Sequence, residues 1–155
     1  MQALVDFFTN FYIVSAASAW LIAQVIKVFT GVFKLQEFTL RNMFFGTGGM
    51  PSSHTAAACA LCAACVLKDG LAASSVAISG VLAMIVMIDA AGVRNETGKQ
   101  SKALNMIISE MFSDSKHADL HFKELIGHSP LQILCGAITG IATAALLYLL
   151  PVFSA

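Results

Sequence analysis

The sequence has 155 residues, of which 57% are hydrophobic and only 12% are charged, and its formal net charge is zero. Soluble domains carry about 25% charged residues, so the composition excludes an ordinary soluble domain. The neutral charge balance gives no electrostatic basis for binding nucleic acid. We therefore expect an integral membrane protein, with residues 1–155 forming a single membrane domain.

Four apolar runs predict membrane spans, because a helix needs about 20 apolar residues to cross a bilayer. The first run holds one charge, Lys27, which lies close enough to the end of the run for its amine to reach the headgroups. The last run contains Gly136 and Gly140, a small-xxx-small pattern that suits close packing of helices. The expected spans cover residues 11–33, 53–67, 71–91 and 131–150.

Two polar loops, residues 34–52 and 92–130, connect these spans. In the second loop, apolar residues recur at helical spacing from Ser101 to Phe112, which predicts an amphipathic helix at the membrane interface. The expected fold class is therefore an all-α integral membrane protein with about four transmembrane helices plus one interfacial amphipathic helix. Because four spans enclose little volume, a homodimer is also considered.

The distribution of basic residues predicts the orientation. If the second and third spans form a hairpin, both polar loops lie on one face of the membrane. Seven of the nine Lys and Arg residues fall in these loops: Lys34, Arg41, Arg94, Lys99, Lys102, Lys116 and Lys123. Basic loops stay on the cytoplasmic side, so we expect a multi-pass protein of the cell membrane with both loops in the cytoplasm.

Residues 46–56 pass from a glycine-rich loop through Pro51 into an apolar run. Either Ser52 or Ser53 suits the N-cap of a helix that begins here. The unpaired N–H groups and the dipole of such a helix favour an anion, and His54 would stand beside it in the first turn. The alternative is a capped helix whose histidine merely lies at the membrane edge.

The expected hairpin also places His54 on the membrane face that carries His128, which immediately precedes the fourth span. Three cations, Lys34, Arg41 and Arg94, share this face. Such a group suits phosphoryl transfer, in which cations neutralise phosphate oxygens, one imidazole attacks phosphorus and the other protonates the leaving oxygen. That scheme needs neither a metal nor a cofactor.

Two further patterns resemble motifs of a known family. Lys34-x6-Arg41 matches Lys-x6-Arg-Pro except that Asn42 replaces proline, and Pro51-Ser52-Ser53-His54 matches Pro-Ser-Gly-His except that Ser53 replaces glycine. The chain thus resembles the type 2 phosphatidic acid phosphatases, which are related to the vanadium haloperoxidases. It is most similar to their divergent branch of small bacterial and plastid membrane proteins.

The third family motif, Ser-Arg-x5-His-x3-Asp, is altered here. His128 fits its histidine, but Gln132 stands in place of the aspartate and no arginine lies six residues upstream. Arg94 is the candidate to replace that arginine through space. Asp89 or Glu124 would supply the missing negative charge, although Asp89 is equally well explained as a structural partner of Arg94.

The resemblance implies a role for each matching residue. His128 would be the nucleophile that forms a phosphohistidine, and His54 the acid that protonates the departing alcohol. Gln132 would orient His128 by accepting a hydrogen bond. The groups that would hold the phosphate oxygens are Lys34, Arg41, Ser52, Ser53 and Arg94.

The function that these residues predict is hydrolysis of a lipid phosphomonoester or diphosphate. The altered third motif leaves open a second class, a catalytically silent membrane protein that binds lipid phosphate as a sensor, carrier or scaffold. A metal-dependent hydrolase using Asp89, Glu96 and Glu124 is a third alternative.

Overall fold

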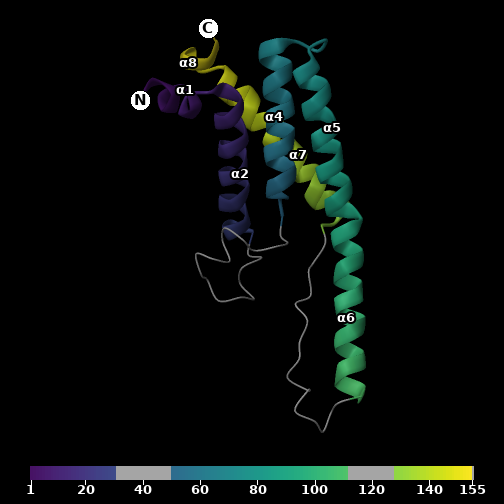
Figure 1. Ribbon diagram of the computed structural model, residues 1–155. Helices are drawn as coiled ribbons and strands as arrows, with labels where there is room; N and C mark the ends of the chain where they lie inside the picture. Colours follow the sequence, from purple (N-terminus) through teal and green to yellow (C-terminus); the bar gives the residue numbers. More distant parts are fainter. Residues whose placement is uncertain (31–49, 112–127, 155) are drawn as a thin grey trace.

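The computed structural model describes residues 1–30, 50–111 and 128–154, and all regular elements in these ranges are α-helices (Figure 1). The expected all-α fold is thus confirmed. A bundle is formed by four long helices: α2 (Phe11–Phe29), α4 (Ser53–Asp69), α5 (Ser74–Ala91) and α7 (Pro130–Tyr148). The remaining helices are α1 (Gln2–Phe8), α6 (Val93–Met111) and α8 (Pro151–Ser154).

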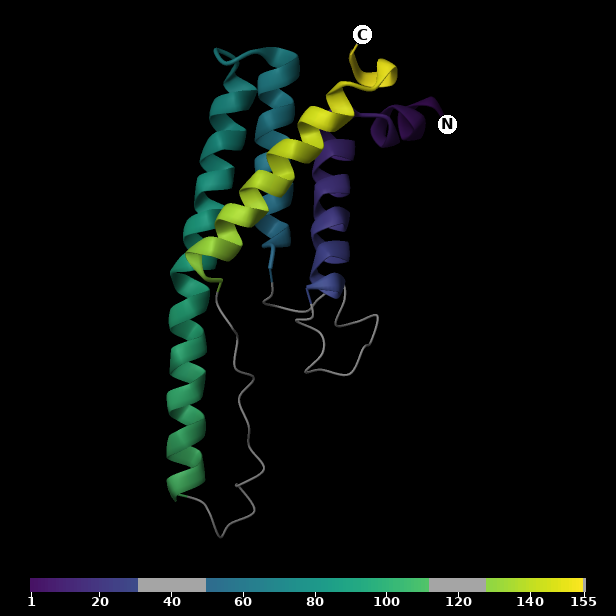
Figure 2. The same cartoon turned by 180° about the vertical axis from the view of Figure 1, so that it is seen from behind.

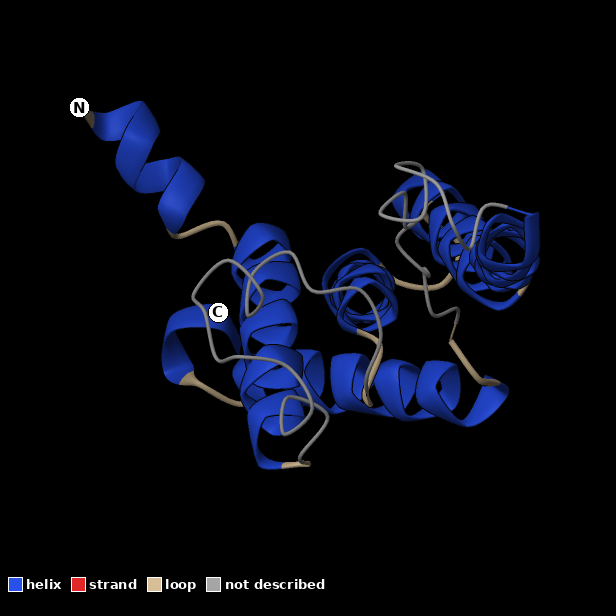
Figure 3. Ribbon diagram, turned by 90° about the horizontal axis from the view of Figure 1, so that it is seen from below, coloured by secondary structure: helices blue, strands red, loops and turns tan. Residues whose placement is uncertain are grey.

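Three helical stretches in the described ranges are long and apolar enough to cross a membrane: Phe11–Phe29, Ser74–Met111 and Pro130–Tyr148. The second of the four expected spans corresponds to α4, which is shorter at 17 residues. Nevertheless α4 is central to the bundle, since it packs against α2, α5 and α7 (Figure 3).

The expected spans agree with the four long helices to within a few residues, although residues 31–33 of the first span lie outside the described ranges. The expected start of the amphipathic helix at Ser101 was wrong, because α6 begins at Val93, directly after α5. Polar residues fill its first turns, so apolar periodicity did not reveal them. Local contacts support these turns: Thr97 Oγ1 donates to the Val93 carbonyl, and Lys99 pairs with Glu96 at 2.7 Å.

Alanine side chains form the centre of the bundle. Ala56 and Ala60 of α4 are fully buried against Ala19 and Ala23 of α2 and Ala144 of α7. Small side chains allow helix backbones to approach closely, which gains dispersion energy along the whole contact. The alanine-rich composition of α4 therefore explains why three helices can surround it.

The contact between α4 and α7 is closest at two glycines. A Cβ atom on Gly140 would lie 2.2 Å from the Ala56 carbonyl oxygen, and one on Gly136 would lie 2.5 Å from the Ser52 carbonyl oxygen. Both distances are far below van der Waals contact, so only hydrogen fits at either position. The packing role expected for these glycines is confirmed.

Helix α7 crosses the bundle diagonally (Figure 2). Just before its first residue, the His128 amide donates to the Ala90 carbonyl near the end of α5, at 3.2 Å. Towards its other end, the Tyr148 ring lies against the Phe11 ring at the start of α2, with 5.8 Å between centroids. Helix α7 therefore moves away from α5 along its length.

A carboxylate connects three helices at the end of the bundle where α4 turns into α5. Asp69 accepts hydrogen bonds from the Ser75 and Tyr12 hydroxyls. These bonds, chiefly that from Ser75, lower the pKa of the exposed Asp69 carboxyl, because they favour its charged form. The ionised carboxylate thus joins α2, α4 and α5 at this end.

Replacing Gly140 by alanine should destabilise the protein, because the new methyl group would overlap the α4 backbone. Overpacking of this kind costs about 1–3 kcal/mol. Gly80→Ala is the matched control, since its Cβ would meet Cys62 Sγ at an ordinary 3.9 Å. Thermal unfolding in detergent should show a lower Tm for Gly140→Ala and no decrease in Tm for Gly80→Ala. An unchanged Tm for both variants would contradict the packing described.

Candidate functional site

The N-terminus of α4 is capped by Ser52, the first of the two serines that the sequence left open. Ser52 Oγ accepts from the Thr55 amide at 3.4 Å and from Thr55 Oγ1 at 2.9 Å. The Ser52 amide in turn donates to the Gln132 carbonyl of α7 at 3.0 Å. These contacts fix the start of α4 beside the first turn of α7, and His54 extends from the first turn of α4 as an exposed side chain.

A capping box fixes the start of α7 and, with it, the position of His128. Ser129 Oγ accepts from the Gln132 amide at 3.4 Å, while Gln132 Oε1 accepts from the Ser129 amide at 2.8 Å. The His128 amide is held by Ala90 of α5, and the His128 side chain is only 6% exposed. Gln132 therefore acts on the backbone next to His128.

His54 and His128 line one cavity of about 200 Å³ at this end of the bundle. Ser52 and the half-buried Asp89 line it as well, together with apolar side chains of α5. Two residues separated by 74 positions thus meet at a single site, as the hairpin argument predicted. Asp89 belongs to the last turn of α5 and directly precedes Ala90, whose carbonyl accepts the hydrogen bond from the His128 amide.

The helices around this cavity give it a defined electrostatic character. Helix α4 begins at the cavity, since its N-cap Ser52 lines it, and α7 begins two residues after His128. Helix N-termini carry partial positive charge and N–H groups that favour anions. The carboxylate of Asp89, in the last turn of α5, adds an acidic group to the lining of the same cavity. The cavity can therefore hold an anion next to two imidazoles and one carboxylate.

Several predicted site residues are not placed at this cavity. Lys34, Arg41 and Glu124 lie outside the described residues, and so does the side chain of Arg94, whose backbone belongs to α6. The side chain of Gln132 does not line the cavity.

Glu96, which the metal-dependent alternative requires, lies on the exposed surface of α6 in its ion pair with Lys99.

Sequence reasoning missed Lys27. Its amine was expected to reach the headgroups, but the side chain is only 2% exposed and Nζ donates to Ser53 Oγ at 3.0 Å. No carboxylate in the described parts of the chain pairs with it. Burying an ammonium among helices is costly, and an ionisable group inside a membrane usually has a function.

The pattern around Lys27 contained the signal for its burial. Lys27 is the last member of a buried stripe at every fourth position of α2: Phe11, Ser15, Ala19, Ala23 and Lys27. Positions four apart share one face of a helix, so the small residues preceding Lys27 indicated a face turned towards other helices. The amine consequently reaches the N-terminus of α4 instead of the lipid headgroups.

The fold and this cavity define a class: an all-α membrane protein whose described residues gather two histidines, a serine and an aspartate at one end of the bundle. The family model "Divergent PAP2 family" matches residues 8–143, and the chain belongs to this family. It is 35% identical over 151 residues to the uncharacterized membrane protein YuiD of Bacillus subtilis (strain 168), covering 88% of this chain and 92% of the relative. No solved structure matches the chain.

Replacing Lys27 by methionine should weaken anion binding at the N-terminus of α4, because it removes the cation that bonds to Ser53, and should not unfold the protein, because methionine fills similar space. A ligand that binds only the folded state raises Tm by mass action. Inorganic phosphate should therefore raise the Tm of the unchanged protein and have little effect on Lys27→Met. Lys68→Met is the matched control, since Lys68 lies over the Tyr148 ring near the opposite end of α4. An equal phosphate shift in all three proteins would exclude an anion at Lys27.

Proposed function

We propose that this protein is a membrane lipid phosphatase that hydrolyses a lipid phosphomonoester or diphosphate through a phosphohistidine. The observation that carries the proposal is the meeting of His54 and His128 in one cavity with Ser52 and Asp89. Attack and protonation must act on one phosphoryl group, so both imidazoles have to reach the same small space. Membership of the divergent PAP2 family supports this reaction class.

In the proposed first step, an imidazole nitrogen of His128 attacks phosphorus and the bond from phosphorus to the lipid oxygen breaks. That oxygen takes a proton from the His54 imidazolium and leaves as the alcohol, or as a lipid monophosphate if the substrate is a diphosphate. In the second step, water attacks the phosphohistidine and gives its proton to the now neutral His54. Inorganic phosphate is released, and both histidines return to their starting states.

The serines at the start of α4 are suited to bind phosphate oxygens. Ser52 Oγ accepts two hydrogen bonds from Thr55, so its own proton can be donated to a phosphate oxygen. Ser53 Oγ accepts from Lys27, and neither residue lines the cavity of the two histidines, so their contact with phosphate is proposed at the N-terminus of α4 next to it. Lys27 and Arg94, with Lys34 and Arg41, complete the proposed set of cations.

We assign to Asp89 the negative charge that the altered third motif lacks. Gln132 is neutral and its side-chain oxygen is engaged by the Ser129 amide. Asp89 lines the same cavity as His128, where its charge would stabilise the imidazolium that forms as His128 is phosphorylated. Glu124 is retained as a supporting candidate.

The bias of Lys and Arg towards residues 34–52 and 92–130 supports a cytoplasmic active site in the cell membrane. A homodimer is also proposed, because four spans enclose little volume around a site.

A second candidate function is binding of lipid phosphate without turnover. It is favoured by one observation, the neutral Gln132 that caps α7 where the family motif has a carboxylate. Without a charge to stabilise the imidazolium, His128 would be a poor nucleophile, and the same cavity would then hold a phosphate without cleaving it.

Purified protein in detergent with EDTA should release phosphate from a lipid phosphate, and His128→Ala should abolish this release. His54→Ala should slow it by about 10²–10⁴-fold, the usual contribution of a general acid. Quenching in alkali during turnover should trap a phosphoryl group that survives base, is lost in acid and is absent from His128→Ala. Lipid binding without phosphate release would favour the second candidate, and release that depends on magnesium would contradict the mechanism.

Asp89→Asn should lower the rate of phosphorylation of His128, because the imidazolium loses its stabilising charge. Asp89→Glu should recover part of the rate, since it restores the charge on a longer side chain. Burst kinetics would measure the phosphorylation step, and Tm would report folding. A Glu variant as slow as the Asn variant, with both folded, would exclude a role for the charge.

A further inference from the structure

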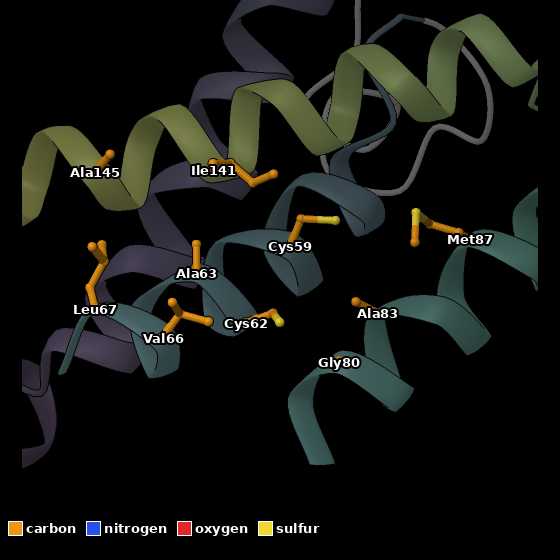
Figure 4. A pocket seen from close by; sticks show the side chains of 10 residues that line it. All are labelled: Cys59, Cys62, Ala63, Val66, Leu67, Gly80, Ala83, Met87, Ile141 and Ala145. Atoms are coloured by element: carbon orange, nitrogen blue, oxygen red, sulfur yellow. The ribbon is translucent and has the colours of Figure 1, made fainter. Parts of the chain in front are cut away.

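A second, larger cavity of about 490 Å³ lies between α4, α5 and α7 (Figure 4). Its walls are apolar or sulfur-containing, with Cys62 on α4, Gly80 and Met87 on α5, and Ile141 and Ala145 on α7. Ligand cavities in proteins measure about 300–1,000 Å³ and are mostly apolar. This cavity thus has the size and lining of a site for a hydrocarbon ligand.

The course of α7 creates this cavity. Helix α7 begins in contact with α5 through His128 and Ala90, and it ends beside α2. The space between α5 and α7 therefore widens with distance from the histidines (Figure 2). Small side chains keep the widened space open, since a Cβ added to Gly80 would meet nothing closer than Cys62 Sγ at 3.9 Å.

The two cavities lie in series along the same pair of helices. On α5, Val86 lines the histidine cavity and the next residue, Met87, lines the apolar one. On α4, His54 and Cys59 line them respectively, about 7.5 Å apart along the helix axis at 1.5 Å per residue. Val86, Met87 and Cys59 also pack in one apolar cluster. A molecule extending from the histidines into the bundle would pass from a polar to an apolar environment.

We propose that the cavity between α4, α5 and α7 holds a hydrocarbon chain of the lipid whose phosphate occupies the His54–His128 cavity. The inference rests on the proposed function for the position of the phosphate. An amphiphile with a charged head and an apolar chain matches the order of the two cavities along α4 and α5. Binding energy from the chain would then position the phosphoryl group against His128.

In the first test, substitutions on two walls narrow the cavity, and the activity of each variant is compared on lipid phosphates with long and short hydrocarbon chains. Ala145→Phe fills it from an exposed position on α7, and Gly80→Leu fills it from α5. Each should lower kcat/KM at least tenfold for a long-chain lipid phosphate and change it little for a short-chain one with the same headgroup. The matched controls are Ala142→Phe and Ala77→Leu, both at exposed positions that do not line the cavity. Equal loss for both chain lengths in folded variants would overturn the inference.

The second test does not need turnover. In vesicles, a phosphatidate with a photoreactive group near the end of one chain should label Leu67 or Ala145, which line the part of the cavity farthest from the histidines, and unlabelled phosphatidate should compete. Equal labelling by a phosphatidylcholine analogue, without such competition, would show that bulk lipid occupies the cavity. A dimer crosslinked through these positions would show that a second copy of the chain covers it. Either result overturns the inference. Competed labelling without phosphate release would support the chain site while excluding hydrolysis. If all variants still released phosphate from the long-chain substrate at the normal rate, hydrolysis would be supported and the chain site would be excluded.

Discussion

The close contact between α4 and α7 is the constraint on which the rest of the structure depends. Where Gly140 meets the Ala56 carbonyl, there is room for a hydrogen atom and nothing larger. This approach brings the Ser52 amide within hydrogen-bond distance of the Gln132 carbonyl and holds the capped start of α7 beside that of α4. The two histidines share a cavity because these two helix starts are side by side.

Polar groups are concentrated at the ends of the bundle, while the interior is filled mainly by alanine. At one end, Asp69 joins α2, α4 and α5 through hydroxyl groups. At the other, the buried amine of Lys27 reaches Ser53, and the next residue along α4, His54, lines a cavity with His128. Such an arrangement places the charges that would bind an anion where helix dipoles also favour one, and leaves the length of the bundle free for apolar contacts.

Much of the fold could be predicted from the sequence because a bilayer requires long apolar runs, and these runs mark the helices directly. The meeting of His54 and His128 followed from a hairpin of two such runs. Lys27 and the start of α6 were misjudged, because a charge near the end of an apolar run is compatible with either a lipid-facing or a buried position, and polar helical turns show no apolar period. The capping bond of Gln132 was missed although Ser129-x-x-Gln132 has the spacing of a capping box, because Gln132 was read only against the aspartate of the third family motif. The roles assigned to Lys34, Arg41 and Glu124 stay predictions on residues outside the described ranges.

The diagonal course of α7 links packing to selectivity. Gly136 and Gly140 hold α7 close to α4 and line neither cavity, yet α7 forms one wall of the space beside Gly80. Relatives with different small residues at these two positions would tilt α7 differently and so accommodate chains of different breadth. If the apolar cavity holds a lipid chain, as proposed, its width would change with the inclination of one helix while every residue around the proposed phosphate site stayed in place.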